Sequence, residues 1–243
     1  ALSVEAPRPL AAALELLARR HGLTICYEDP AYSFAGDLDD VTEKVRRDLD
    51  RYPPGQAPRV LVPRKAALAL RYPAVPGERL ADPAAVLQRL IDAHAAADNP
   101  GRFRLLLREG RFLVVPLAVR DGKGELVDVG PVLDTRITLP GRVRTGYEAV
   151  EEVLAAASEA ARVRISPGLA PLRLLDSWRG FLEADREPAR DILLRAFTGV
   201  EAGAGGRKLV WQLFYDPGQR WYFLNMTLAG EPAGTADPAG KGS

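Results

Sequence analysis

The chain repeats one order of predicted elements. In each copy an amphipathic helix leads into a short β-branched strand, and a second helix and a two-stranded hairpin complete the unit. The first copy occupies residues 9–20, 23–27, 83–96 and 103–115, and the second occupies residues 146–161, 163–166, 187–197 and 208–226. We predict an α+β fold of two small domains in tandem, each with two helices packed on small mixed β-sheets in the order βαβ-βα-ββ.

The first helix of each copy is defined by apolar side chains at intervals of three and four residues, which lie on one helical face. In the first copy Pro9 suits the first turn of a helix, and Gly22 suits its end because glycine accepts the left-handed conformation. Arg162 stands in the place of that glycine in the second copy. The apolar positions are Leu10, Leu14 and Leu17 in the first copy, and Val150, Val153 and Leu154 in the second.

The copies differ most in a segment that only the first contains. Residues near 28–66 are rich in charge and then in proline and glycine, and we predict a mobile insertion with a helix beginning near Asp39. The third strand of the second copy is expected within Leu172 to Phe181. These patterns divide the chain into a first domain over residues 1–133, a second over residues 134–230 and a disordered tail over residues 231–243, which has no large apolar side chain.

The overall charge argues against nucleic acid as the default partner. The 33 basic and 32 acidic side chains leave a net charge of +1, which gives no general attraction to phosphate. We therefore expect a protein or a small molecule as the partner.

Cysteine use and the lack of a long apolar segment bear on the compartment. Cys26 is the only cysteine, so it cannot form a disulfide within the chain, and we expect it to be buried in a strand. No segment approaches the ~20 apolar residues that span a bilayer. The sequence begins at Ala1, and Met226 is its only methionine, so we expect that a leader was removed or that the sequence was trimmed. We predict a periplasmic or otherwise exported bacterial protein.

Both copies resemble the short N-terminal domain of secretins and of signalling TonB-dependent receptors, the STN domain. The resemblance lies in Pro9 to Tyr27, Ala84 to Leu90 and Arg104 to Val115, and it is weaker in the second copy, where Arg162 replaces the glycine. It implies two helices against small sheets, no cofactor, no reaction and binding to other envelope proteins. The chain lacks a barrel, a secretin core and a membrane segment, which argues against a pore or transport role and favours an envelope adaptor.

Candidate catalytic and metal-binding groups are sparse. The two histidines stand outside any motif that supplies several metal ligands, and we interpret His21 as a cation at a helix end and His94 as a helix surface residue. No serine lies in a Gly-x-Ser-x-Gly motif. We predict no enzyme activity, and therefore no catalytic residues, no cofactor and no metal.

Arginines next to aromatic residues favour an alternative function, nucleic-acid binding. The basic residues concerned are Arg102, Arg104, Arg108 and Arg111 on the first hairpin, and Arg220 beside Trp221 and Tyr222 on the second. Such side chains can neutralise phosphates and stack on bases, although a half-buried strand also has a polar face for purely structural reasons. A small ligand in a cleft between the units is a further alternative.

We favour a protein partner, because a small sheet leaves edge strands whose backbone groups can pair with an extended segment of another protein. Aromatic side chains often anchor protein interfaces. The candidate partner-binding residues are Trp211, Tyr215, Arg220, Trp221 and Tyr222. The competing interpretation is that Trp211 and Trp221 fill the second core. The sequence thus predicts a non-enzymatic protein-interaction or adaptor module of the bacterial cell envelope.

Overall fold

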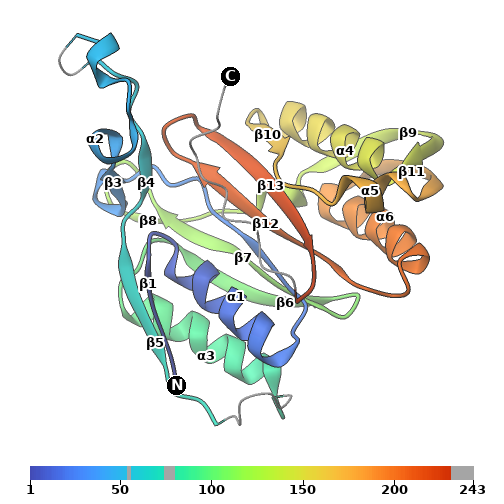
Figure 1. Cartoon of the computed structure of the whole chain (residues 1–243), viewed down its shortest axis with the longest axis horizontal. Helices are drawn as coiled ribbons and strands as arrows, with labels where there is room; N and C mark the ends of the chain where they lie inside the picture. The colour runs from blue at the N-terminus through green and yellow to red at the C-terminus, as the bar shows by residue number, and fades with distance from the viewer. Residues whose placement is uncertain (54–55, 74–79, 231–243) are drawn as a thin grey trace.

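Apart from its inserted segment, the described part of the first half forms two small groups of paired strands and two long helices (Figure 1). The computed structural model describes residues 1–53, 56–73 and 80–230, so the predicted tail over residues 231–243 lies outside the described residues. The elements are β1 (Leu2–Ala6), α1 (Pro9–His21), β2 (Ile25–Glu28), β5 (Ala66–Leu70), α3 (Pro83–Ala96), β6 (Arg102–Arg108) and β7 (Arg111–Arg120). Strand β1 pairs antiparallel with β5, while β2, β7 and β6 pair in that order.

The second half repeats this arrangement element by element. Its elements are β9 (Arg136–Thr145), α4 (Gly146–Ala161), β10 (Arg164–Pro167), β11 (Arg179–Pro188), α6 (Ala189–Gly203), β12 (Leu209–Asp216) and β13 (Trp221–Leu228). Strand β9 pairs antiparallel with β11, and β10, β13 and β12 pair in that order. Strands β10, β13 and β12 are therefore the counterparts of β2, β7 and β6. The predicted α+β fold is confirmed.

The two halves share one sheet. Strand β12 runs parallel to β2, with Gln212 beside Tyr27 and Leu213 beside Glu28, and this pairing joins the two three-stranded sheets edge to edge. With β8 (Leu126–Asp128) added beside β7, the result is a seven-stranded sheet in the order β10-β13-β12-β2-β7-β6. Separate sheets were expected in each half, and no local pattern in the sequence indicates this junction.

The second half is turned over relative to the first. The strands follow the same spatial order in both halves, yet the parallel pairing of β12 with β2 reverses the direction of every counterpart strand. The helices of the two halves must then lie on opposite faces of the joined sheet. Side chains of β2 agree with this, because Ile25 and Tyr27 pack in the core of α1 and α3 whereas Cys26 packs in the core of α4 and α6. Figure 1 shows the two helix pairs at opposite ends of the molecule.

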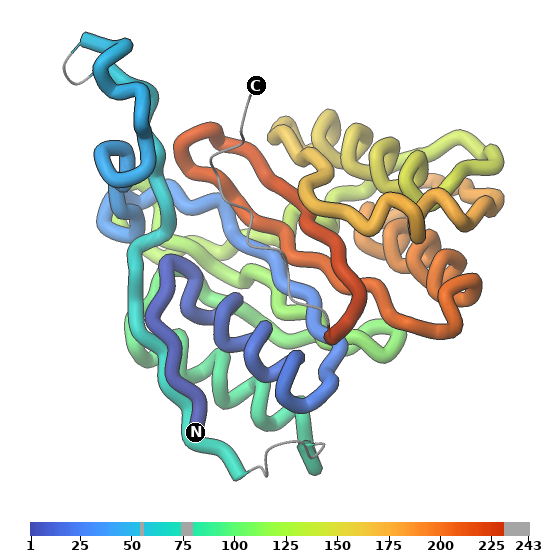
Figure 2. The backbone as a smooth tube through the Cα atoms, viewed as in Figure 1, coloured from blue at the N-terminus to red at the C-terminus, as the bar shows by residue number. Residues whose placement is uncertain are grey.

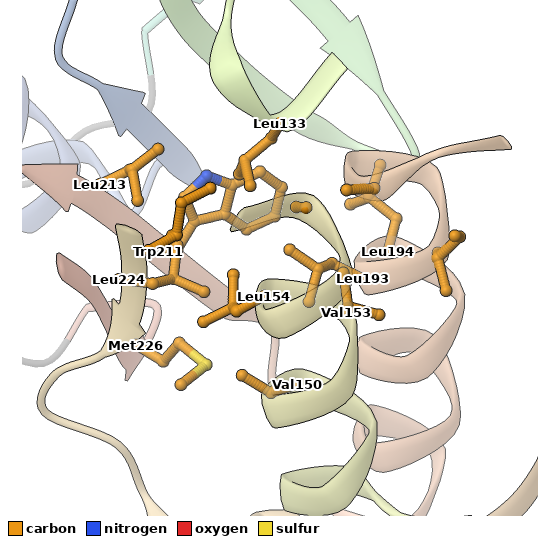
Figure 3. Close-up of a cluster of buried hydrophobic side chains, with 14 of the residues drawn as sticks. Leu133, Val150, Val153, Leu154, Leu193, Leu194, Trp211, Leu213, Leu224 and Met226 are labelled. Atoms are coloured by element: carbon orange, nitrogen blue, oxygen red, sulfur yellow. The ribbon is translucent and has the colours of Figure 1, made fainter. Parts of the chain in front are cut away.

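The larger core lies under α4 and α6 and extends beneath both halves. Trp211 of β12 is fully buried there and lies among aliphatic side chains from both halves, including Leu133, Leu154 and Leu213 (Figure 3). Leu133 belongs to the short turn η3 (Val132–Asp134), which precedes the second repeat. Helix α6 thus packs on the strands of its own half and also on the face of the first-half strands that lies opposite α1 and α3.

The two counterpart first helices end in the same backbone conformation. Gly22 follows α1 with a φ of 63°, and Arg162 follows α4 with a φ of 54°. Glycine adopts this left-handed region freely, whereas it costs other residues about 1–2 kcal/mol. Arg162 adopts this conformation because the chain makes the same turn from helix to strand in both repeats.

Two predictions about the second repeat are wrong in detail. The region Leu172 to Phe181 contains the short helix α5 (Leu172–Asp176) before β11 begins at Arg179, so the third strand lies later than expected. The helix turn forms because Pro171 accepts hydrogen bonds from the N–H groups of Leu174 and Leu175, and Leu175 is fully buried against α4. The second helix also continues to Gly203, well past Phe197.

In the inserted segment, the helix expected near Asp39 is short and begins later, at Thr42, and it lies in a projection that contains a pair of antiparallel strands. Residues Asp39 and Asp40, expected to begin a helix, lie in β3 (Leu38–Asp40), which pairs antiparallel with β4 (Leu61–Pro63). The helical turn η1 (Ala35–Asp37) precedes β3. Between β3 and β4 the described residues form the four-residue helix α2 (Thr42–Val45) and the helical turn η2 (Leu49–Arg51). Figure 2 shows η2 far from the sheets, at the upper left.

His94 is buried, which corrects its interpretation as a surface residue. It is 2% exposed on α3, its Nε2 lies 3.0 Å from the carbonyl oxygen of Pro100, and its ring packs edge-on against Phe103. Burial lowers the pKa of His94 from 6.5 to about 4. The folded protein therefore keeps the imidazole neutral at a pH at which the unfolded chain would protonate it.

The stability of the protein should consequently fall as the pH is lowered from about 6.5 to about 4. In this window the unfolded state binds the His94 proton and the folded state does not, so the loss is on the order of 3 kcal/mol. Urea unfolding at a series of pH values, compared between the natural protein and His94→Gln, isolates this contribution from that of the carboxylates. Equal pH dependence in the two proteins would contradict the assignment.

Candidate protein-interaction surfaces

Three of the five predicted partner-binding residues face the second core. Trp211 is 0%, Tyr215 7% and Tyr222 4% exposed, because alternate residues of β12 and β13 point toward α4 and α6. The indole Nε1 of Trp211 also donates to Oε1 of Glu28 at 3.3 Å. The side chains of these three residues are therefore part of the core and do not form an accessible surface.

The other two predicted residues lie where β12 turns into β13. Arg220 is exposed in the turn, with a φ of 57° and its N–H bonded to the carbonyl oxygen of Asp216 at 2.8 Å. Trp221 is half-buried on the face opposite the second core. Its ring contacts Phe223 at 4.7 Å between centroids, and the guanidinium of Arg164 lies 3.8 Å above it.

Trp221 belongs to a larger surface that we call the open face. It is the side of β10, β13 and β12 that faces away from α4 and α6, and all of its side chains are partly or fully exposed. Its members are Arg164, Ser166, Val210, Gln212, Phe214, Trp221, Phe223, Asn225 and Thr227. Three of these side chains, Phe214, Trp221 and Phe223, are aromatic, and aromatic residues are enriched at protein interfaces.

The counterpart of the open face in the first half is buried. The register pairs Cys26 with Leu113 in the first half and Ser166 with Phe223 in the second, so these positions correspond. Cys26 and Leu113 are at most 1% exposed, because α6 lies over them. Among the residues that the structure describes, no helix occupies the same position over the open face, and only α1 borders it.

The groove between α1 and the open face is too small for a metabolite. It is lined by residues of α1, β2, β12 and β13, including Leu14, Arg19 and Gln212, and its volume is about 40 Å³. That volume holds about one water molecule, whereas small-molecule pockets measure roughly 300–1,000 Å³. The groove gives no support to the alternative of a small ligand.

The outer edge of β6 is a second accessible feature. Strand β6 pairs with β7 on one side, and the described residues place no strand on its other side. Leu107 of β6 lies opposite Phe112 of β7, and the N–H of Phe112 points away from β6 and donates to the carbonyl oxygen of Thr24. The Leu107–Phe112 pair is therefore one of the pairs of the antiparallel ladder that exchange no hydrogen bonds. The backbone N–H and C=O groups of Leu107, and by alternation those of Leu105, therefore point outward.

A buried charge network connects the two halves at the junction. Nη2 of Arg190 lies 2.9 Å from Oε2 of Glu28, and the side chains are 3% and 1% exposed. Burial raises the pKa of Glu28, and Arg190 opposes that rise. Nη1 of Arg190 also lies 3.2 Å from Oδ1 of Asp134, without the geometry of a hydrogen bond.

A second buried pair links the start of β7 to the end of α6. The guanidinium of Arg111 donates to the carboxylate of Glu201, and Glu201 also accepts from the N–H of Leu209 at 2.6 Å. Arg111 is fully buried, so it is not part of a basic surface for nucleic acid, which corrects its place in the arginine cluster. These carboxylates are enclosed by partners and inaccessible to a substrate, so we assign them to holding the halves together.

The remaining candidate groups do not assemble into a catalytic or metal site. Burial raises the pKa of the Cys26 thiol to about 12, which leaves almost no thiolate at neutral pH. Nε2 of His21 lies 3.1 Å from the hydroxyl of Tyr72, whereas Nε2 of His94 lies 3.0 Å from the carbonyl oxygen of Pro100, so the two histidines have different partners. Within residues 1–53, 56–73 and 80–230, no three His, Cys, Asp or Glu side chains are grouped so that they could hold a metal ion.

Comparison with known proteins identifies no relative. No family model, no curated protein sequence and no solved structure matches the chain. Among the described helices, none is long and apolar enough to cross a membrane. The two accessible surfaces are therefore the features of the molecule that bear on its function.

Proposed function

We propose that the chain is a non-enzymatic protein-interaction or adaptor module of the bacterial cell envelope, and that a partner protein binds the open face. The observation that carries the proposal is the contrast between the two halves. The same sheet face is sealed beneath α6 in the first half and remains partly exposed in the second, with Trp221 and Phe223 at its centre. Partly exposed aromatic side chains on a sheet are typical anchors of protein interfaces.

The rigidity of the sheet supports the same proposal. The buried ion pairs and the parallel β12–β2 pairing hold both halves in one orientation. A preorganised surface loses little conformational entropy when a partner binds, so modest contact area can give useful affinity. The periplasmic or otherwise exported location is part of the proposal and rests on the resemblance to STN domains and on the scarcity of cysteine.

Site-specific photo-crosslinking in the native bacterium tests the proposal. A photoreactive phenylalanine analogue at Phe223 should form an adduct with a protein of the envelope fraction. The matched control is the same analogue at Phe181, which is 64% exposed on β11, outside the open face. Identical adducts from both positions, or none from Phe223, would refute the proposal. Adducts that disappear after nuclease treatment would support the nucleic-acid alternative instead.

A further inference from the structure

We propose that the outer edge of β6 accepts an extended acidic segment of a partner protein as an additional parallel strand. This inference rests on the proposed function and names a second surface and the chemistry of what binds there. It starts from the outward backbone groups of Leu105 and Leu107. Within the described parts of the chain, the outward N–H groups of these residues have no hydrogen-bond partner.

The protein already contains one example of this interaction. Strand β12 is the counterpart of β6, and the register places Leu213 opposite Leu224 just as it places Leu105 opposite Val114. The outer edge of β12 is paired with β2, which runs parallel to it, and the N–H of Asp29 donates to the carbonyl oxygen of Leu213 at 2.8 Å. The equivalent edge at β6 has the same backbone geometry and no such strand among the described residues.

The side chains along β6 specify the charge of the added strand. Successive side chains of a strand point to opposite faces, so Arg102, Arg104 and Arg108 lie on one face of β6. Leu105 and Leu107 lie on the other face. Arg108 is exposed, and the side chain of Arg104 is 46% exposed, with Asp134 at 3.8 Å as its ion-pair partner. A segment that alternates acidic and aliphatic residues would match both faces, because opposite charges on adjacent strands stabilise their pairing.

A second copy of the chain does not suit this edge. The strand that corresponds to β2 is β10, and its Pro167 stands where β2 has Tyr27, so a backbone N–H needed for pairing is missing. Just beyond β10, the N–H of Leu169 already donates to Oδ1 of Asn225 on β13 at 2.9 Å, so it is not available to a further strand. Strand β10 of another copy therefore lacks the backbone donor that β2 offers to β12, which favours a segment of a different protein as the occupant.

Peptide titration against the full chain tests the proposal. The probe is a synthetic peptide of alternating glutamate and valine, and its matched control is the lysine and valine peptide of the same length. We expect the acidic peptide alone to bind and to slow amide hydrogen exchange at Leu105 and Leu107. Binding of both peptides with equal affinity, or unchanged exchange at these two residues, would overturn the proposal.

Two substitutions locate the binding at β6. Leu107→Pro removes an outward N–H, which an edge strand tolerates, and it should weaken binding at least about fivefold relative to Leu107→Ala. Arg108→Glu reverses an exposed charge and keeps the proposal testable if the proline variant does not fold. If Arg108→Glu bound the acidic peptide with unchanged affinity, the proposal would be contradicted. If the peptide fails to bind while the Phe223 adduct persists, this inference is wrong and the proposed function stands.

Discussion

Replacing Arg190 with alanine is expected to lower the free energy of unfolding by about 3–5 kcal/mol, because the substitution leaves a buried carboxylate without its ion-pair partner. Arg190 and Glu28 are almost completely buried, with 2.9 Å between their charged groups. Without the guanidinium, the carboxylate of Glu28 would remain in the core with only the indole N–H of Trp211 as a partner. Urea unfolding monitored by tryptophan fluorescence measures the change.

Two controls separate the effect of charge from that of packing. Lys65→Ala removes an exposed ion pair with Glu5, whose side chains are 56% and 66% exposed, and should cost at most about 1 kcal/mol. The double variant Glu28→Leu with Arg190→Met leaves no buried charge and should recover most of the lost stability. A double variant as unstable as Arg190→Ala would show that packing, rather than the unpaired carboxylate, causes the loss.

Replacing Trp211 with alanine is expected to cost about 3–5 kcal/mol, because the indole is fully buried between the two halves. Its ring packs edge-on against Phe197 at 5.9 Å between centroids, and its N–H satisfies Glu28. The variant loses both the packing and the hydrogen bond. Thermal and urea unfolding would detect the change.

This variant also decides between the two interpretations of Trp211 that the sequence left open. An interface residue would change partner binding without changing stability, whereas a core residue would do the reverse. Phe181→Ala is the matched control, because this aromatic side chain is 64% exposed and should change the stability by no more than about 0.5 kcal/mol. Equal losses in the two variants would contradict the burial of Trp211.

The position of the candidate surface was only partly predictable. Neighbouring residues of β12 and β13 face opposite sides of the sheet. This alternation alone could have shown that Trp221 lies on the other face from Trp211, Tyr215 and Tyr222. The alternation alone does not show which of the two faces packs in the core. That choice depends on which face α4 and α6 cover, so the five predicted residues include members of both faces and do not include Phe223.

The insertion and α5 show where local patterns were insufficient. Acidic residues at Asp39 and Asp40 favour the first turn of a helix, but pairing with β4 satisfies their backbone groups and competes with it. In the second repeat Leu172 to Asp176 reads equally well as a short strand or as a helical turn, because a short apolar run has no clear periodicity. Tertiary contacts decided both cases.

The amino-acid sequence by itself determined the repeated order of elements, the positions of the main helices and the turns between them. These depend on contacts between residues close in the chain: apolar side chains three and four apart, a glycine or proline at a helix end, and alternation in a strand. Only the tertiary structure decided that β12 joins β2, that the second half is turned over, and that one sheet face is sealed while its counterpart is open. Those features depend on backbone groups and buried charges nearly two hundred residues apart, such as Asp29 with Leu213, and no local periodicity encodes such a pairing.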